Sequence, residues 1–152
     1  MTQTALKPRR WLLAVDPRVY HWDTLFVKGK EMWRHAGHKP DALRQLKQFK
    51  KGDRALLYHG KPDHALYALA EVSRDPYPDP HHPETKKLVI DLRAVERLPR
   101  QVRLEELREN KLLRKIKFLK NTRLTISPLT DEEYTEILRM AGIVASPGIP
   151  LP

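Results

Sequence analysis

The stretch Arg54–Val72, RALLYHGKPDHALYALAEV, decides the fold class of this chain of 152 residues. Its first part, Arg54–His59, is apolar at both alternating sets of positions, and so is its last part, Ala65–Val72. Strands with this pattern are buried on both faces of a sheet. Because the turn-forming residues Gly60–Asp63 separate the two runs, we predict a hairpin at the centre of a sheet that is covered on both sides.

A third strand is predicted downstream, over Leu88–Leu98, and its pattern changes part-way along. Apolar residues alternate as far as Leu92 and Ala94 and then move by one place to Val95. Such a change of parity within a strand is typical of a β-bulge, which bends a sheet towards a barrel. The sheet is therefore expected to be curved.

The rest of the chain supplies outer strands and helices. The predicted strands are Arg10–Val15 and Arg123–Ile126, and the predicted helices are Asp16–Val27, Asp41–Lys51, Leu104–Glu109, Lys111–Leu119 and one from the capping box at Thr130 to Gly142. Irregular structure is expected in Trp33–Pro40 and in Asp75–Pro83, which holds four prolines. This order predicts an α+β fold, a curved mixed β-sheet or small open barrel with helices packed outside.

The expected organisation is one domain over residues 10–143, with a flexible N-terminal arm at 1–9 and a proline-rich tail at 144–152. No apolar run approaches the roughly 18 residues of a membrane span. The polar start of the chain lacks the apolar core of a signal peptide, and there is no cysteine. We therefore expect a cytoplasmic protein without a membrane partner.

The charge of the chain favours a polyanionic partner. There are 29 Lys and Arg against 19 Asp and Glu, a formal net charge of +10. Clustered cations gain affinity for phosphates by releasing counterions from nucleic acid. The basic residues gather in two segments, and the candidates for phosphate binding are Arg44, Lys47, Lys51, Arg114, Lys117, Lys120 and Arg123.

Aromatic side chains are candidates for stacking on an unstacked base. Trp22 follows the apolar spacing of a predicted helix, which favours a place in the core. Trp33 precedes an irregular loop where core packing is not required, so we expect Trp33 to line a site, together with Tyr58.

Motifs for catalysis are absent from the sequence: there is no glycine-rich phosphate loop and no glycine-flanked serine nucleophile. The histidines lack cysteine partners or an HExxH spacing, so no metal or other cofactor is expected. Two alternatives to a binding module stay open. One is an enzyme acting on nucleotides through His59 and Asp53, and the other is a protein-interaction adaptor that uses the tail Ser146–Pro152.

Several short motifs follow one another along the chain. They are Trp11-Leu12 with Asp16-Pro17 and Tyr20, Trp33 ahead of Lys50-Lys51-Gly52-Asp53, Tyr58-His59, Glu71-Val72 with Tyr77-Pro78-Asp79-Pro80, and the run Arg123–Thr130, RLTISPLT. In this order, over about Arg10–Gly142, the set resembles the EVE domain family.

The resemblance implies a PUA-like fold and a non-catalytic pocket for a modified nucleobase in DNA or RNA. It makes Trp33, Tyr58 and His59 the pocket candidates. The Asp-Gly-Val-Arg-Asn that follows the tryptophan in the family is replaced here by Arg34–Lys39, so His35 and His38 join the candidates. A base in such a pocket has left its stack, so we expect single strands or a flipped base as ligand, with a changed base preference and a pH dependence at about 6–7.

Overall fold

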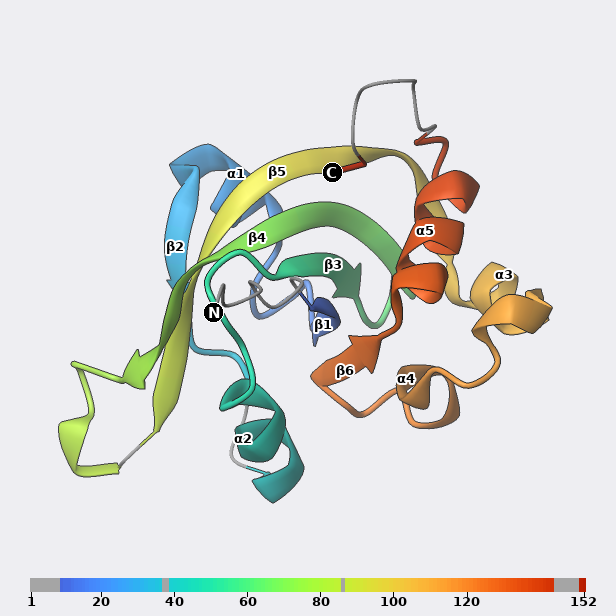
Figure 1. Cartoon of the computed structure of the whole chain (residues 1–152). Helices are drawn as coiled ribbons and strands as arrows, with labels where there is room; N and C mark the ends of the chain where they lie inside the picture. The colour runs from blue at the N-terminus through green and yellow to red at the C-terminus, as the bar shows by residue number, and fades with distance from the viewer. Residues whose placement is uncertain (1–8, 37–38, 86, 144–150) are drawn as a thin grey trace, which may run out of the picture.

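The computed structural model describes residues 9–36, 39–85, 87–143 and 151–152. Its centre is one six-stranded mixed sheet with the order β2-β5-β4-β3-β1-β6 (Figure 1). β1 and β3 are parallel, and all other neighbours are antiparallel. The strands are β1 Arg10–Val15, β2 Lys30–Trp33, β3 Arg54–His59, β4 Ala65–Pro78, β5 Leu88–Arg103 and β6 Ile126–Leu129.

The sheet is curved by its two longest strands, β4 and β5, which arch across the molecule in Figure 1. In their register Ala70 pairs with Ala94, but the preceding Leu69 pairs with Glu96, so Val95 is an extra residue on β5. An extra residue on one strand is a β-bulge and increases the local bend. The bulge predicted at Val95 is confirmed.

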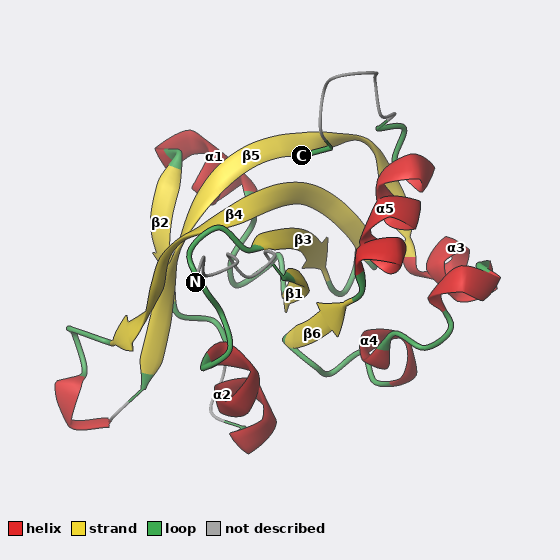
Figure 2. Ribbon diagram, in the orientation of Figure 1, coloured by secondary structure: helices red, strands yellow, loops and turns green. Residues whose placement is uncertain are grey.

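Five α-helices of the described residues lie around the sheet (Figure 2). They are α1 Asp23–Lys28, α2 Pro40–Leu46, α3 Leu104–Glu109, α4 Lys117–Lys120 and α5 Asp131–Met140, with short 3-10 turns at Pro83–Thr85 and Lys111–Leu113. The capping box of α5 is confirmed, because Thr130 Oγ1 accepts the backbone N–H of Glu133 at 3.1 Å and Glu133 Oε1 accepts that of Thr130 at 2.8 Å. No helix among the described residues is long and apolar enough to cross a membrane.

Both faces of the sheet are buried, as the doubly apolar strands predict. On β3, Leu56 and Tyr58 enter one core cluster, whereas Ala55 and Leu57 enter the other. Residues of α3, α4 and α5 complete the first cluster, and residues of α1 and α2 complete the second. The predicted hairpin is confirmed as β3 and β4.

The first predicted helix begins later than the sequence suggests. Asp16 forms a closed turn, in which its carbonyl accepts the N–H of Val19 at 2.9 Å and its Oδ1 accepts the N–H of Arg18 at 2.8 Å. Such side-chain bonds to the following backbone compete with a helix. The helix therefore starts at Asp23, seven residues downstream.

Two predicted irregular segments contain strand. Trp33, the first residue of the predicted loop, is the last residue of β2. This short strand forms because it pairs with β5, with Trp33 opposite Ile90. β4 continues through Tyr77 to Pro78, since it pairs with β5 along its whole outer part. The last strand, β6, begins at Ile126, where the prediction ended. The predicted arm and tail lie almost wholly outside the described residues, as does the tail on which the adaptor hypothesis rests.

Candidate nucleic-acid interface

A pocket of about 320 Å³ opens where the parallel strands β1 and β3 end, and we term it the β1–β3 pocket. The backbone N–H of Gly60 donates to the carbonyl of Val15 at 2.8 Å and holds the two strand ends together. The segment that precedes β6 closes the other side. The lining residues are Ala14, Val15, Asp16, Val19, Tyr20, His35, Tyr58, Gly60, Lys61, Thr122, Arg123, Leu124 and Thr125. The volume lies at the lower end of the range for small-ligand sites.

Tyr58 provides the only buried hydroxyl without a hydrogen bond among the side chains that line this pocket. Its side chain is 1% exposed, and its ring packs edge-on against Phe118 with the ring centroids 4.6 Å apart. Burial raises the pKa of Tyr58 to about 12, so the phenol is neutral and able to donate at physiological pH. A buried polar group left unpaired costs free energy, which a ligand that bonds to it recovers.

Tyr20 and His35 form a second wall, with their ring centroids 4.7 Å apart and a tilt of 37°. The Tyr20 hydroxyl donates to the carboxylate of Glu31. Burial lowers the pKa of His35, and the charge of Glu31 opposes this shift only in part. The imidazole is therefore neutral at pH 7 and offers one donor and one acceptor.

The rim of the pocket is cationic. Arg123 and Lys61 both line the pocket, and both are exposed. The one carboxylate of the lining, Asp16, is already occupied by Arg18 through contacts of 2.8 and 3.0 Å. This arrangement suits a phosphate at the rim above a neutral interior.

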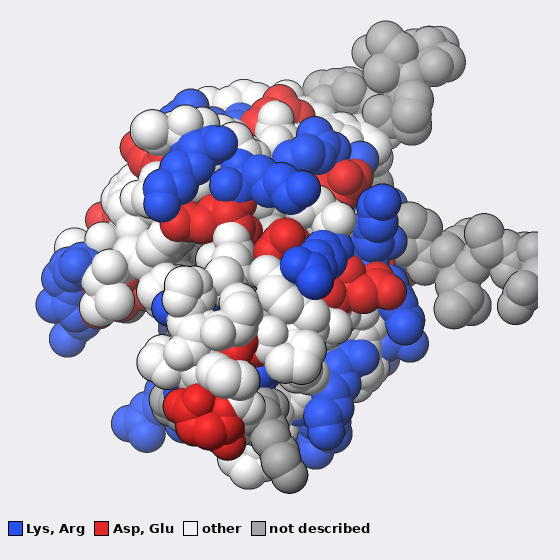
Figure 3. Space-filling model, turned by 90° about the vertical axis from the view of Figure 1, so that its left-hand side faces the viewer, with Lys and Arg blue, Asp and Glu red and all other residues white. Residues whose placement is uncertain are grey.

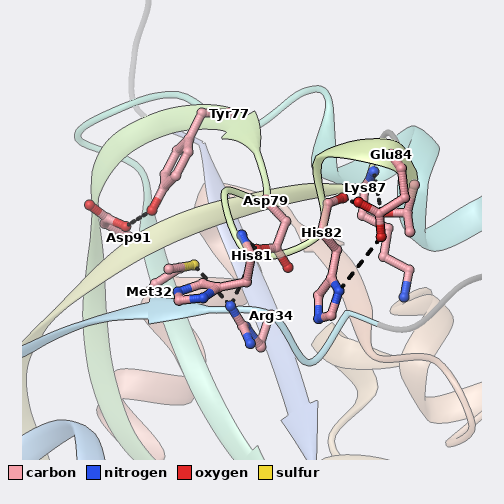
Figure 4. Close-up of polar contacts among 10 residues, drawn as sticks. Met32, Arg34, Tyr77, Asp79, His81, His82, Glu84, Lys87 and Asp91 are labelled. Carbon is pink, nitrogen blue, oxygen red and sulfur yellow. Dashed lines mark hydrogen bonds and ion pairs between the residues drawn. The ribbon is translucent and has the colours of Figure 1, made fainter.

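A hydrogen bond fixes the His35 wall in place: Thr125 Oγ1 donates to the carbonyl of Ala36 at 2.6 Å. A second anchor lies at the loop between β4 and β5, where the buried Asp79 accepts Arg34 at 3.3 Å and the N–H of His81 at 2.9 Å (Figure 4). No local pattern predicted a role for Asp79, although it belongs to the motif Tyr77-Pro78-Asp79-Pro80 that contributes to the resemblance. Through Asp79 this motif holds Arg34, which directly precedes His35 in the chain.

His59 does not line the pocket, because successive residues of a strand point to opposite faces and Tyr58 takes the pocket side. Its Nε2 accepts the backbone N–H of Trp22 at 3.0 Å, and its side chain is buried. Burial, aided by the nearby His21, lowers the pKa of His59 to about 4. His59 therefore acts as a neutral acceptor inside the fold.

His59 and Asp53, the acid/base groups of the enzymatic hypothesis, do not share a site, since they lie at opposite ends of β3. A strand of this length spans about 17–20 Å. Asp53 instead accepts the indole N–H of Trp11 at 2.9 Å and the backbone N–H of Lys50 at 3.0 Å. Its role is to join strand ends.

His21, His59 and Asp63 place possible ligand atoms within 4.8 Å of one another. Because Nε2 of His59 accepts a hydrogen bond, the neutral ring carries its proton on Nδ1, which lies 3.9 Å from Asp63. A protonated nitrogen has no lone pair for a metal ion. The cluster is therefore better explained by packing and hydrogen bonding than by metal binding.

Trp33 is 2% exposed and stacks on Trp22 with ring centroids 6.2 Å apart. The prediction that the neighbouring loop frees Trp33 from the core is wrong, because β2 directs this residue into the second core cluster. The core position predicted for Trp22 is confirmed. His38 lies outside the described residues.

The predicted phosphate-binding residues separate into groups. Arg123 lies at the rim of the β1–β3 pocket, and Arg114 lies in a groove beside α5. Arg44 and Lys117, which are far apart in the sequence, line one cavity at the other end of β1. Lys47, Lys51 and Lys120 are exposed and line neither the pocket nor this cavity.

One face of the molecule carries many cations, but it also carries many acids. Figure 3 shows Lys and Arg side chains interleaved with Asp and Glu on this face. β5 contributes ion pairs of this kind, such as Arg93 with Glu71 at 2.9 Å and Arg97 with Asp23 at 3.0 Å. Paired cations are less available to phosphates, so a high net charge alone does not locate the interface.

The family model of the EVE domain matches residues 9–140. The chain belongs to the EVE domain family. A search of curated proteins finds no match. Among solved structures, an NMR structure of a protein from Rhodopseudomonas palustris is 28% identical with a TM-score of 0.85, covering 93% of this chain and 98% of that one.

Two structural neighbours of this EVE domain are complexes with nucleic acid. Human THYN1 protein in complex with DNA containing 5-methylcytosine is 21% identical with a TM-score of 0.78, covering 88% of this chain and 97% of that one. The YTH domain of the MRB1 protein of Zygosaccharomyces rouxii, in complex with N6-methyladenosine RNA, is 14% identical with a TM-score of 0.56. The match covers 93% of this chain and 91% of that one. These neighbours confirm the predicted α+β, PUA-like fold.

Proposed function

We propose that this EVE domain binds nucleic acid and holds one modified nucleobase in the β1–β3 pocket. The observation that carries the proposal is the pocket of about 320 Å³, which is lined by the neutral side chains of Tyr20, His35 and Tyr58 and by the cations Lys61 and Arg123. The hydroxyl of Tyr58 is buried behind this lining and has no hydrogen bond among the described residues. The heteroatoms of a base edge suit the donors and acceptors of such a lining. The complexes of human THYN1 and of the YTH domain, both with methylated nucleic acid, support the same ligand class.

The division of roles follows the chemistry of the lining. Tyr58 and His35 are neutral groups that read the edge of the base, Tyr20 offers an aromatic surface beside His35, and Arg123 and Lys61 hold the flanking phosphates. The role is one of binding and not of catalysis. A base must leave its stack to reach the pocket, so single strands bind more tightly than duplexes.

The test is a titration of matched single-stranded oligonucleotides that differ at one central base: cytosine, 5-methylcytosine, adenine or N6-methyladenine. A group of the pocket that stays unpaired with the wrong base costs about 1–3 kcal/mol. We therefore expect one modified base to bind at least about fivefold more tightly than its unmodified parent. Equal affinities for all these oligonucleotides, and for other modified bases tried in the same way, contradict the proposal.

Affinity for the preferred oligonucleotide should also fall as salt is added, with a log–log slope of roughly −2 to −5. The reason is that several cations release counterions together. Binding that is independent of salt shows that phosphates are not contacted.

A further inference from the structure

A second hollow lies at the opposite end of β1 and is termed the cationic cavity. Its volume is about 630 Å³. Its lining residues are Arg9, Arg10, Trp11, Arg44, Gln45, Gln48, Lys117, Pro128, Leu129, Thr130 and Asp131. They come from the start of β1, from α2 and the turn after it, from the start of α4, from the end of β6 and from the start of α5. The fold thus brings together cations from both basic segments of the sequence.

The positive charge of this cavity is only partly compensated. Arg10 Nε is buried without a hydrogen bond, and its nearest carboxylate, that of the exposed Asp131, lies 3.8 Å away. Arg9 bonds to the neutral Gln48 at 2.6 Å. In the described part of the chain, Lys117 has no ion pair or hydrogen bond through its side chain. Cations held close together in a concave surface attract an oxyanion.

The remaining members add further polar groups. Among the described residues, Arg44 is paired only with Asp41 on its own helix, and the Arg44 side chain is 67% exposed. Gln45 is 6% exposed, and its amide lines the cavity with no hydrogen bond to the described residues. An amide can donate to a phosphate oxygen, as Arg and Lys do.

One segment of the chain connects the cavity with the β1–β3 pocket. Residues 122–125 line the pocket, and residues 128–131 line the cavity. Between them lies a smaller hollow of about 270 Å³ with an apolar lining that includes Ala42, Leu124 and Ile126. β6, which belongs to this segment, is an edge strand and contacts both α2 and α4 (Figure 1). The three hollows therefore follow one edge of the sheet.

We propose that the cationic cavity binds a backbone phosphate of the same oligonucleotide whose modified base occupies the β1–β3 pocket. The inference rests on the proposed function. The two sites are separated by the length of β1, about 17–20 Å, which corresponds to roughly five to six stacked nucleotides. A short oligonucleotide therefore reaches the pocket alone, whereas a longer one reaches both sites.

The test compares a trinucleotide with a dodecanucleotide, each with the same modified base at its centre. Lys117→Gln leaves binding of the trinucleotide unchanged and weakens binding of the dodecanucleotide about fivefold at 0.1 M salt, since one phosphate contact to a single strand contributes a slope of about −0.7. Arg44→Gln, at an exposed position that does not support the core, should likewise weaken binding of the dodecanucleotide and leave binding of the trinucleotide unchanged. Lys30→Gln is the matched control, because Lys30 is an exposed lysine of β2 at the other edge of the sheet.

The inference is overturned when Lys117→Gln and Lys30→Gln bind the dodecanucleotide with equal affinity. Failure of the proposed function has a different result, because the wild-type protein then shows no preference for a modified base even in the trinucleotide. The two outcomes are measured in separate titrations.

Free anions are the other source of a phosphate group, and inorganic pyrophosphate distinguishes the two sources. We expect excess pyrophosphate to remove the additional affinity of the dodecanucleotide and to leave trinucleotide binding intact. Two results together overturn the inference and assign the cavity to a free anion. Pyrophosphate then raises the melting temperature of the wild-type protein but not of Lys117→Gln, and the affinity for oligonucleotides does not depend on their length.

Discussion

The two ends of β1 lead into sites of opposite character. At its carboxyl end the β1–β3 pocket has a neutral interior, in which the buried phenol of Tyr58 lacks a hydrogen-bond partner among the described residues. At its amino end the cationic cavity gathers four Arg and Lys side chains around one exposed carboxylate, Asp131. The same short strand therefore connects a pocket with a neutral, hydrogen-bonding interior to a cavity with an excess of positive charge.

This difference shows how selectivity and affinity separate in one small domain. A neutral hydrogen-bonding group distinguishes bases, because a mismatched ligand leaves it unpaired at a cost of about 1–3 kcal/mol. A cluster of cations binds any backbone phosphate and carries no information about the base. Substitutions at the two ends are expected to change different measured quantities.

The largest expected effect concerns the scaffold behind the pocket end. Trp22 and Trp33 are both buried and pack on each other, so Trp22→Ala and Trp33→Ala should each lower the free energy of unfolding by about 3–5 kcal/mol. Denaturant unfolding measures both. A Trp33→Ala protein of wild-type stability that has lost only base binding contradicts the core assignment and restores Trp33 as a stacking platform.

The next effect is a loss of stability in weak acid, caused by His59. Its pKa lies at about 4 in the fold against 6.5 as the ordinary value, so the unfolded chain binds the additional proton between these values. The contribution of His59 is complete above pH 6.5 and is lost as pH falls towards 4, by about 1.4 kcal/mol per unit and about 3 kcal/mol in all. His35, whose pKa burial also lowers, adds in the same direction.

Unfolding free energies measured from pH 7 to pH 4.5 test this expectation against His59→Gln, which should have a flatter profile. An equal slope in both proteins assigns the acid sensitivity to other groups. The sequence suggests a pH dependence of binding at about 6–7. The lowered pKa of His35 moves any pH dependence through that residue to lower pH, and His59, with its pKa at about 4, does not titrate in this range.

A smaller effect tests the pocket itself. Tyr58→Phe removes the buried hydroxyl and should weaken binding of the preferred modified base by about 1 kcal/mol, or about fivefold, with stability unchanged or slightly raised. Tyr77→Phe is the matched control. The Tyr77 hydroxyl donates to Asp91 at 2.5 Å, and Tyr77 does not line the pocket. Preserved base discrimination in Tyr58→Phe shows that the phenol does not read the base.

The smallest effect separates phosphate binding from base reading at the pocket rim. Arg123→Gln should weaken all oligonucleotides alike, by about fourfold at 0.15 M salt, and reduce the salt slope by about 0.7. The ratio of affinities for modified and unmodified bases should not change. A changed ratio places Arg123 among the groups that contact the base.

Local patterns predicted much of the fold. Periodicity and short-range hydrogen bonds are local properties, each contained within a few residues. They predicted the strands β3 and β4, which are apolar at both alternating sets of positions, the bulge at Val95 and the capping box at Thr130. β2 was missed, since a four-residue strand has too short a pattern and exists only through its pairing with β5.

For the site, the sequence by itself determined the family, the excess of positive charge and the presence of Tyr58 in a doubly buried strand. Only the tertiary structure decided that Tyr58, whose ring packs in a core cluster, also lines the pocket, whereas His59 is turned to the opposite face of β3 and accepts the backbone N–H of Trp22. Strand parity does not tell which of two successive residues lies beside a pocket. The tertiary structure also decided that Arg44 and Lys117 meet in one cavity. Contacts between residues so far apart depend on how the helices pack against the sheet edge, and no local pattern records that packing.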